Sequence, residues 1–303
     1  MEEGHSRSGH QGGVISRVTD PTRADEAIDR SSVSDHYANS DLTRAIQNGL
    51  TLLGKTTSTV TIDDLAPVDE FHVGGRKATE DLIGQLGIAS GYHVLDVGCG
   101  LGGPARFVAD RYECRVSGID LTFDYVETGN RLCEWVGLSD RVKLCQATAL
   151  SVPFRDAVFD AAYMLHVGMN IEDKESLCLE VARVLRPSAL FAVYDVMRTA
   201  GGELSYPLPW ATTRASNAVE SPERYKRALE LAGFEILSER NRKDFALAYF
   251  NDLRSRTSLG GGPAPLGLHT LMGERRQDQI RNMIENISIG RIAPVELIVR
   301  KTA

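Results

Sequence analysis

Three glycines and a distant carboxylate have the spacing of a loop that binds a nucleotide. Gly98, Gly100 and Gly103 follow the apolar run at 93–97 and fit the pattern G-x-G-x-x-G, and Asp120 lies 20 residues beyond Gly100. Such a loop brings backbone amides to a ligand, while a carboxylate at the later position accepts hydrogen bonds from ribose hydroxyls. We therefore expect a ligand that contains adenosine.

A second carboxylate, Asp96, lies two residues before the first glycine. In a dinucleotide site the loop faces a pyrophosphate, which a neighbouring carboxylate would repel strongly in a site shielded from water. S-adenosylmethionine has no phosphate and carries a sulfonium and an ammonium, which a carboxylate attracts. Asp96 as a structural cap of the loop would fit either cofactor but would not explain the charge. The loop therefore favours S-adenosylmethionine.

A parallel sheet would position these residues, because apolar segments of strand length alternate with helical segments. The predicted strands are 93–97, 114–120, 142–147, 159–165, 190–196, 234–240 and 294–301. The predicted helices are 35–53, 78–88, 103–111, 124–137, 172–187, 221–233 and 274–287, with loops at 54–69 and 197–220. The fold class is α/β: a Rossmann-like, doubly wound, seven-stranded and mostly parallel sheet, with an N-terminal helical cap and a lid insertion.

The 303 residues are enough for one large domain with its own core. Residues 1–33 are polar and we expect a disordered tail, so that 34–303 form the domain. The net charge of −7 argues against a nucleic-acid partner. No apolar run is long enough to span a bilayer and no signal peptide is visible, so we expect a cytoplasmic protein. The sequence leaves a homo-oligomer open.

The cysteines predict neither a disulfide framework nor a metal site. Their number is odd, and neither a C-x-x-C pair nor an H-E-x-x-H motif occurs. We therefore expect free thiols in a reducing compartment and no metal. The five are Cys99, Cys114, Cys133, Cys145 and Cys178.

The motifs together resemble those of class I S-adenosylmethionine-dependent methyltransferases, over roughly residues 34–303. The resembling segments are VLDVGCGLGG, GIDLT, ATALSVPF with FDAAYMLHVGMN, and VARVLRPSALFAVYDV. Within that superfamily the sequence is most similar to the sarcosine/dimethylglycine N-methyltransferase-type small-molecule group. That finer resemblance rests on DEFHVGGRKAT, LHVGMNIEDK, YPLPWA and GLHTLMG.

The superfamily resemblance implies roles for cofactor-binding residues. Asp96, Gly98 and Gly100 would line the methionyl end, Asp120 would hold the ribose, and Leu121 would pack beside the adenine. Thr148 and the backbone of Ala149 would lie near the adenine amino group, although family members usually have Asp, Asn or Ser where Thr148 stands. His166 would border the sulfonium.

The same resemblance implies an acceptor pocket. Its candidate substrate contacts are Tyr37, His72, Met169, Asn170 and Trp210, and the candidate catalytic residues are His166 and His72. Each has a structural alternative, as a core aromatic, a packing residue or a histidine bonded to a loop carbonyl. Methyl transfer is an in-line displacement that needs alignment and exclusion of water, and a base only when the acceptor arrives protonated.

Several functions fit these observations. The leading one is methyl transfer to a small amine such as sarcosine or dimethylglycine, whose carboxylate would need a cation. Arg76 and Arg214 are the candidates for that cation, although we expect solvated salt bridging as the role of each. The alternative is an O- or C-methyltransferase of natural-product or isoprenoid metabolism, for which a diphosphate acceptor would need clustered Arg or Lys. An NAD-dependent oxidoreductase and a scaffold that binds the cofactor without catalysis also remain open.

Overall fold

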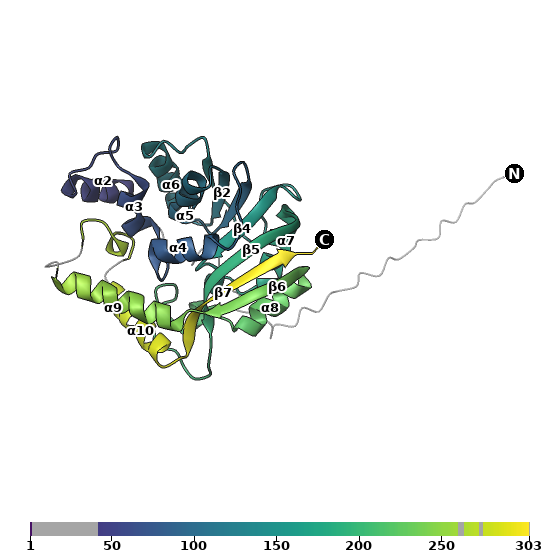
Figure 1. Cartoon of the computed structure of the whole chain (residues 1–303). Helices are drawn as coiled ribbons and strands as arrows, with labels where there is room; N and C mark the ends of the chain where they lie inside the picture. Colours follow the sequence, from purple (N-terminus) through teal and green to yellow (C-terminus); the bar gives the residue numbers. More distant parts are fainter. Residues whose placement is uncertain (2–41, 260–263, 273–274, 303) are drawn as a thin grey trace.

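The structure, a computed structural model, describes residues 1, 42–259, 264–272 and 275–302 (Figure 1). Apart from Met1, the predicted tail lies outside the described residues, as do Tyr37 and the start of the helix predicted at 35–53. Among the described residues, no helix is both long and apolar enough to cross a membrane.

A seven-stranded sheet in the order β3-β2-β1-β4-β5-β7-β6 forms the centre of the fold. Only β7 runs antiparallel to its neighbours β5 and β6. The predicted fold class, a Rossmann-like and mostly parallel seven-stranded sheet, is therefore confirmed. The strands are β1 (His93–Val97), β2 (Arg115–Asp120), β3 (Val142–Gln146), β4 (Phe159–Leu165), β5 (Leu185–Arg198), β6 (Phe234–Asn241) and β7 (Ile292–Lys301).

Helices cover both faces of the sheet. Alternate residues of β4 point to opposite faces, as a strand requires: Ala162 packs with one layer of helices, Tyr163 with the other. One layer consists of α4 (Gly75–Ile83), α5 (Gly103–Arg111) and α6 (Phe123–Trp135). The other consists of α7 (Lys174–Val184) and α8 (Pro222–Leu231). This two-sided burial explains why the strands are apolar along most of their length.

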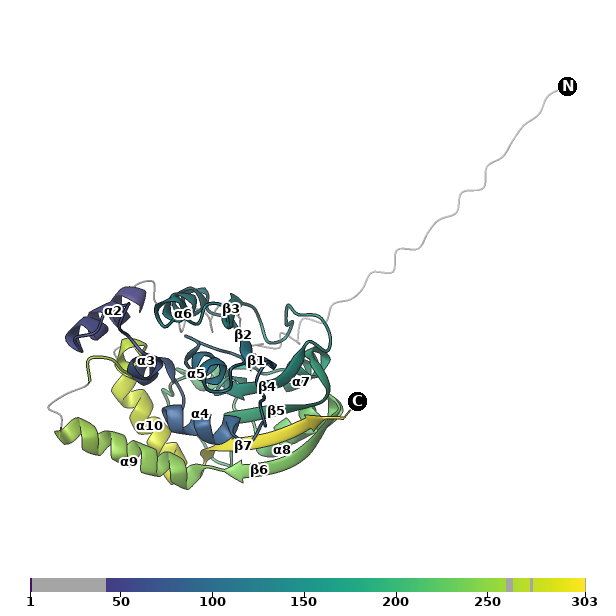
Figure 2. The same ribbon diagram turned by 45° about the horizontal axis from the view of Figure 1, so that its top comes forward.

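Four further helices gather at one end of the sheet (Figures 1 and 2). They are α2 (Leu42–Leu52), α3 (Ile62–Asp69), α9 (Lys243–Leu259) and α10 (Arg276–Ser288). The pairs α3 with α5 and α9 with α10 are in contact, and short 3-10 turns lie at η1 (Gly168–Asn170), η2 (Arg214–Ser216) and η3 (Leu268–Thr270). These helices stand beyond the carboxyl ends of the parallel strands, where α/β proteins bind ligands.

Two helices were not predicted from the sequence. The stretch predicted as a loop at 54–69 contains α3, which begins with a capping box between Thr61 and Asp64 and continues through Pro67. The second is α9, in a stretch for which no element was predicted. The loop prediction is wrong over α3. The stretch lacks a long apolar periodicity, which made it look like a loop, but its capping box begins a short helix.

Candidate cofactor and acceptor site

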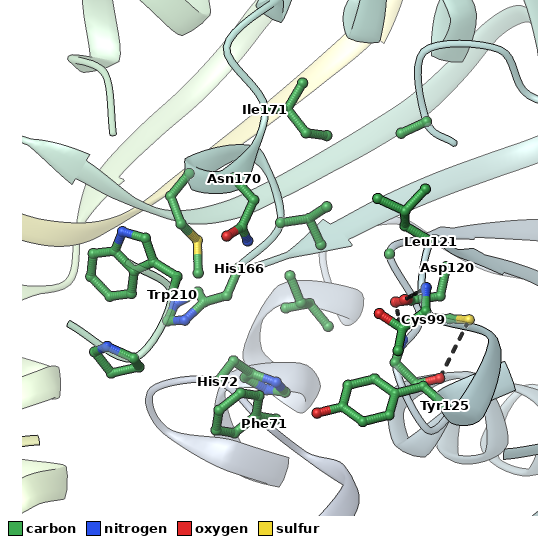
Figure 3. A pocket seen from close by; sticks show the side chains of 18 of the residues that line it. Phe71, His72, Cys99, Asp120, Leu121, Tyr125, His166, Asn170, Ile171 and Trp210 are labelled. Atoms are coloured by element: carbon green, nitrogen blue, oxygen red, sulfur yellow. Dashed lines mark hydrogen bonds between the residues drawn. The ribbon is translucent and has the colours of Figure 1, made fainter. Parts of the chain in front are cut away.

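A cavity of about 600 Å³ lies at the carboxyl ends of the parallel strands. Figure 3 shows Asp120 and Leu121 on one side of it and His166 and Trp210 on the opposite side. The structure brings twelve of the predicted site residues to its wall, whereas Tyr37 lies outside the described residues. The twelve are His72, Asp96, Gly98, Gly100, Asp120, Leu121, Thr148, Ala149, His166, Met169, Asn170 and Trp210.

The glycine loop connects β1 to α5. Two of its positions require a residue without a side chain, each for a different reason. Gly98 has φ of +75°, and a Cβ there would collide with the side chain of Val167. Gly100 has φ of +52°, but a Cβ there would meet no atom within 4 Å. Gly98 is thus required by packing, while Gly100 leaves open space at the cavity wall for a ligand.

Asp120, at the end of β2, ties the loop to the next strand. Its Oδ2 accepts a 2.8 Å hydrogen bond from the amide of Gly100, and its Oδ1 accepts one of 2.9 Å from the amide of Thr122. Burial raises the pKa of the Asp120 carboxyl. Its position matches the predicted ribose contact, and the same carboxyl also holds the glycine loop in place.

Asp96 lies inside the sheet at the bottom of the cavity. It is 1% exposed, and its Oδ2 accepts a hydrogen bond from the hydroxyl of Tyr163. Burial raises the pKa of Asp96 to about 8. The sequence argument assumed a standing negative charge here, whereas burial favours the neutral carboxyl until a cation comes near.

His166 follows β4 and has an unusual backbone conformation. Its φ is +56°, a region that residues other than glycine rarely occupy, and its buried Nε2 has no hydrogen-bond partner among the described residues. Burial holds the pKa of His166 well below its usual value, so the ring is neutral at pH 7. A strained backbone and an unpartnered polar atom at a cavity wall are typical of a functional residue.

His72 lies between α3 and α4 and faces His166, with 6.0 Å between the two ring centroids. Its Nε2 is within hydrogen-bonding distance of the carbonyl of Gly75 and the hydroxyl of Thr79. Burial lowers the pKa of His72 to about 4, so this ring is also neutral at pH 7. The structure therefore places two neutral imidazoles side by side in the wall.

The short turn η1 carries Met169 and Asn170, and buried polar groups hold it. Asp195 packs closely against the turn, since a Cβ on Gly168 would lie only 2.5 Å from its Oδ2. The same oxygen accepts a 2.7 Å hydrogen bond from the hydroxyl of Tyr225. The buried Lys174 donates to the carbonyls of Ile171 and Ala218. These contacts fix the part of the wall that follows His166.

The part of the cavity away from the glycine loop is apolar. Trp210 is 4% exposed and its indole donates to Asn217, so its ring forms part of this wall in a fixed orientation. Sequence reasoning missed most of the wall, because α9 and α10 supply much of it. Together with Trp210, the apolar residues are Phe71, Val73, Met169, Pro209, Tyr249, Phe250, Leu253, Leu268, Leu271, Met272, Ile280 and Met283.

The arginines considered for an acceptor carboxylate lie elsewhere. Arg76 donates to Glu70 and Asp63 and stacks on Phe107, outside the wall of this cavity. Arg214 is exposed and also lies outside the wall. Neither arginine is therefore placed to bind an acceptor carboxylate in this cavity, whereas the ion pairs of Arg76 with Glu70 and Asp63 agree with the salt-bridging role expected for it.

The residues present fit S-adenosylmethionine on chemical grounds. The cavity has the volume of a typical small-molecule site. Its loop end combines open space at Gly100 with the buried carboxyl of Asp96 and the half-buried carboxyl of Asp120, which suit a ligand that brings positive charge and ribose hydroxyls. When bound, this cofactor supplies an electrophilic methyl group.

Comparison with known sequences agrees with this geometry. A family described as the methyltransferase domain matches residues 95–193. Methyltransferase GfsG of Streptomyces halstedii is 29% identical over 57% of this chain and 64% of its own length. A sterol 24-C-methyltransferase of Eremothecium gossypii is 34% identical over 58% and 49%, and an O-methyltransferase, rstn1, of Aspergillus nomiae NRRL is 27% identical over 65% and 83%. The match thus spans about half to two thirds of the first two relatives.

Solved structures share the fold. Geranyl diphosphate C-methyltransferase from Streptomyces coelicolor A3(2) superposes with a TM-score of 0.62, at 20% identity, over 78% of this chain and 91% of that chain. A putative sarcosine dimethylglycine methyltransferase from Galdieria sulphuraria gives 0.62 at 18%, over 86% and 98%. Likeness at this identity concerns the fold alone.

The fold, the site and the domain match define a class. Residues 95–193 form a methyltransferase domain within this seven-stranded sheet, and S-adenosylmethionine is its cofactor. The finer resemblance to the sarcosine/dimethylglycine group has only a distant structural counterpart, since two of the relatives described above act, by their names, on a sterol and at oxygen.

Proposed function

We propose that this chain transfers the methyl group of S-adenosylmethionine to an uncharged and mainly apolar small molecule, at carbon or at oxygen. The observation that carries the proposal is the wall around Trp210, Phe250 and Met283, which is almost entirely aliphatic, aromatic or thioether in character. Such a wall gains free energy by burying apolar surface, at roughly 25 cal/mol per Å².

The electrostatics of the cavity support an acceptor without negative charge. Arg224 is the one Lys or Arg among the described residues of the wall, and both of its terminal nitrogens donate to Glu175. A carboxylated amine such as sarcosine, or an isoprenyl diphosphate, would need an available cation. The oxygen and carbon alternatives are therefore better supported than the amino-acid amine expected from the sequence.

The chain's own residues would act mainly by positioning. Asp96 and Asp120 would hold the charged and ribose parts of the methyl donor, while the apolar wall would align the acceptor and exclude water. His166 and His72 are polar side chains of the cavity wall and would orient the reacting group of the acceptor.

An acceptor screen with methyl-labelled S-adenosylmethionine tests the proposal. The panel contains a sterol, a polyphenol, geranyl diphosphate, sarcosine and dimethylglycine. We expect label on the sterol or the polyphenol; label on the amino acids alone would contradict the proposal. Calorimetry and melting curves with S-adenosylmethionine and NADH give the separate test, since stabilisation by NADH alone would indicate an oxidoreductase. Binding of the methyl donor without turnover of any acceptor would indicate a scaffold.

A further inference from the structure

Several acceptors converge on one nitrogen of His72. Its Nε2 lies 3.1 Å from the carbonyl oxygen of Gly75 and 3.0 Å from Oγ1 of Thr79. The carboxylate oxygen Oε2 of Glu70 lies 3.5 Å away. Since a carbonyl oxygen can only accept a hydrogen bond, Nε2 must carry a hydrogen.

The hydroxyl of Thr79 imposes the same constraint. It donates a 2.6 Å hydrogen bond to Oε2 of Glu70, and its single proton is thereby used. Toward His72 this hydroxyl can then act only as an acceptor. Glu70 is itself held by Arg76, whose Nε donates to Oε1 at 2.6 Å. Glu70, His72 and Thr79 are all buried, so water does not compete for these bonds.

The tautomer leaves the other ring nitrogen, Nδ1, with a lone pair. Burial keeps the imidazole neutral at pH 7, because it lowers the pKa of His72 to about 4. Nδ1 makes no hydrogen bond to any described residue, and the ring is part of the cavity wall. A lone pair beside the apolar part of the wall is suited to a ligand that brings a hydrogen-bond donor.

We propose that Glu70 and Thr79 hold His72 protonated at Nε2, so that Nδ1 accepts the proton of a hydroxyl group on the methyl acceptor. The inference rests on the proposed function and narrows it to methylation at oxygen. His72 is then a catalytic residue, and Glu70 and Thr79 are positioning residues.

The step balances with the groups named. The acceptor oxygen forms a bond to the methyl carbon as the bond from carbon to sulfur breaks, and the sulfonium keeps that electron pair as a thioether. The hydroxyl proton moves to Nδ1 of His72 and leaves later to water. The resulting imidazolium has the Glu70 carboxylate beside its Nε2, as an acid–base pair requires.

Hydroxyl acceptors differ from the other candidates in this site. An alkene carbon has no donor for Nδ1 and would leave its lone pair unpaired in the bound complex. A neutral amine does have a donor, so it must be compared directly with a hydroxyl on the same carbon skeleton. Three probes that share the naphthalene ring allow this comparison: 2-naphthol, 2-naphthylamine and 2-vinylnaphthalene.

The first measurement separates this inference from the proposed function. Calorimetry of the full chain with S-adenosylhomocysteine should show binding; its absence would overturn the proposed function itself. With the same complex, ¹⁵N spectra of labelled histidine should show His72 protonated at Nε2. A His72 protonated at Nδ1 would overturn the inference while the methyltransferase assignment stands.

Thr79→Val tests the positioning role, because valine has the shape of threonine without its hydroxyl. The variant should shift His72 toward a mixture of tautomers and leave S-adenosylhomocysteine binding unchanged. Thr128→Val is the matched control, since Thr128 is also buried and its hydroxyl pairs with Thr43 instead. An unchanged tautomer in Thr79→Val would contradict the role of Thr79.

Turnover with labelled S-adenosylmethionine completes the test. We expect label on 2-naphthol in preference to the other two probes, and about a tenfold lower kcat in Thr79→Val with a similar KM. Addition of 2-naphthol, but not of its methyl ether, should move the Nδ1 resonance of His72. Label on 2-vinylnaphthalene or 2-naphthylamine instead, no label on 2-naphthol, or an unmoved resonance would each overturn the hydroxyl assignment.

Discussion

The hydroxyl of Tyr163 donates a 2.9 Å hydrogen bond to Oδ2 of Asp96 between neighbouring strands. The two residues are register partners in β1 and β4, and both are buried. The fold thus provides a single hydroxyl donor to a carboxyl whose pKa burial raises to about 8. Ionising Asp96 costs free energy until a cationic ligand arrives. Because this carboxyl lies inside the sheet, its charge state links cofactor binding to the stability of the sheet.

Asp96→Asn should weaken cofactor binding and stabilise the free protein above about pH 4, with the full effect reached above pH 8. The amide keeps an acceptor for Tyr163 and removes the cost of ionising a buried acid. We expect about a tenfold or greater loss of S-adenosylmethionine affinity, since hydrogen bonds to charged groups contribute about 1.5–3 kcal/mol. The melting temperature at pH 9 should rise by about 2 °C for each kcal/mol gained. Calorimetry and thermal unfolding measure these changes. Asp156→Asn, at an exposed carboxylate, is the control, and unchanged affinity in Asp96→Asn would contradict the role of Asp96.

Cofactor affinity should increase with pH between about 6.5 and 8. In the free protein Asp96 holds its proton below its pKa of about 8, and a cationic ligand favours the ionised form. Binding must therefore displace a proton, and each pH unit below 8 weakens the affinity by at most about tenfold. His72, with a pKa of about 4, does not titrate in this range. Dissociation constants measured across the range should show this slope, and Asp96→Asn should remove it. A flat profile in the unmodified protein would contradict the coupling.

Gly98→Ala and Gly100→Ala should separate folding from binding. At Gly98 a methyl group meets Val167 in addition to the positive φ, so we expect a loss of about 2–4 kcal/mol of stability. At Gly100 it enters open space, so we expect a loss of only about 1 kcal/mol from the backbone but severe loss of cofactor binding. Chemical denaturation and calorimetry measure the two effects. Unchanged cofactor affinity in Gly100→Ala would show that the space at Gly100 does not belong to the ligand.

Arg106→Leu should be among the most destabilising changes in the chain. The guanidinium of Arg106 donates to Asp69 at 2.5 Å, and neither side chain is exposed. Removal of the cation leaves a carboxylate buried without its partner, at a cost of about 3–5 kcal/mol. Urea unfolding measures the loss. Combining it with Asp69→Asn should restore part of it, whereas additive losses would show that the pair is not coupled.

The sheet was predictable because its signal is local. Each predicted strand overlaps an observed one, since strands buried on both faces are runs of apolar residues bounded by turns. The sequence of α9 does contain a helical pattern. One helical face carries Ala246, Tyr249, Phe250 and Leu253. Its neighbours are polar and a glycine-rich stretch follows, which makes the segment look like a loop.

The sequence predicted the cofactor half of the site better than the acceptor half, again because local signals are readable and tertiary contacts are not. Gly98, Gly100 and Asp120 belong to short motifs whose chemistry is visible in their spacing. The contact between His72 and His166 depends on how α4 and β4 pack, which no local pattern encodes. The apolar acceptor wall was missed for this reason, since it forms only when α9 and α10 fold over the strand ends. The roles of the individual site residues remain predictions.

The cover made by α9 and α10 is one stretch of chain between β6 and β7. The methyl-donor half of the cavity, by contrast, is built from the loops after β1, β2 and β3. Changes within this insert can therefore alter one side of the acceptor wall while the donor half of the cavity stays the same. The rest of the acceptor wall, which includes His72 and Trp210, lies on other segments, so a full change of acceptor also requires divergence there.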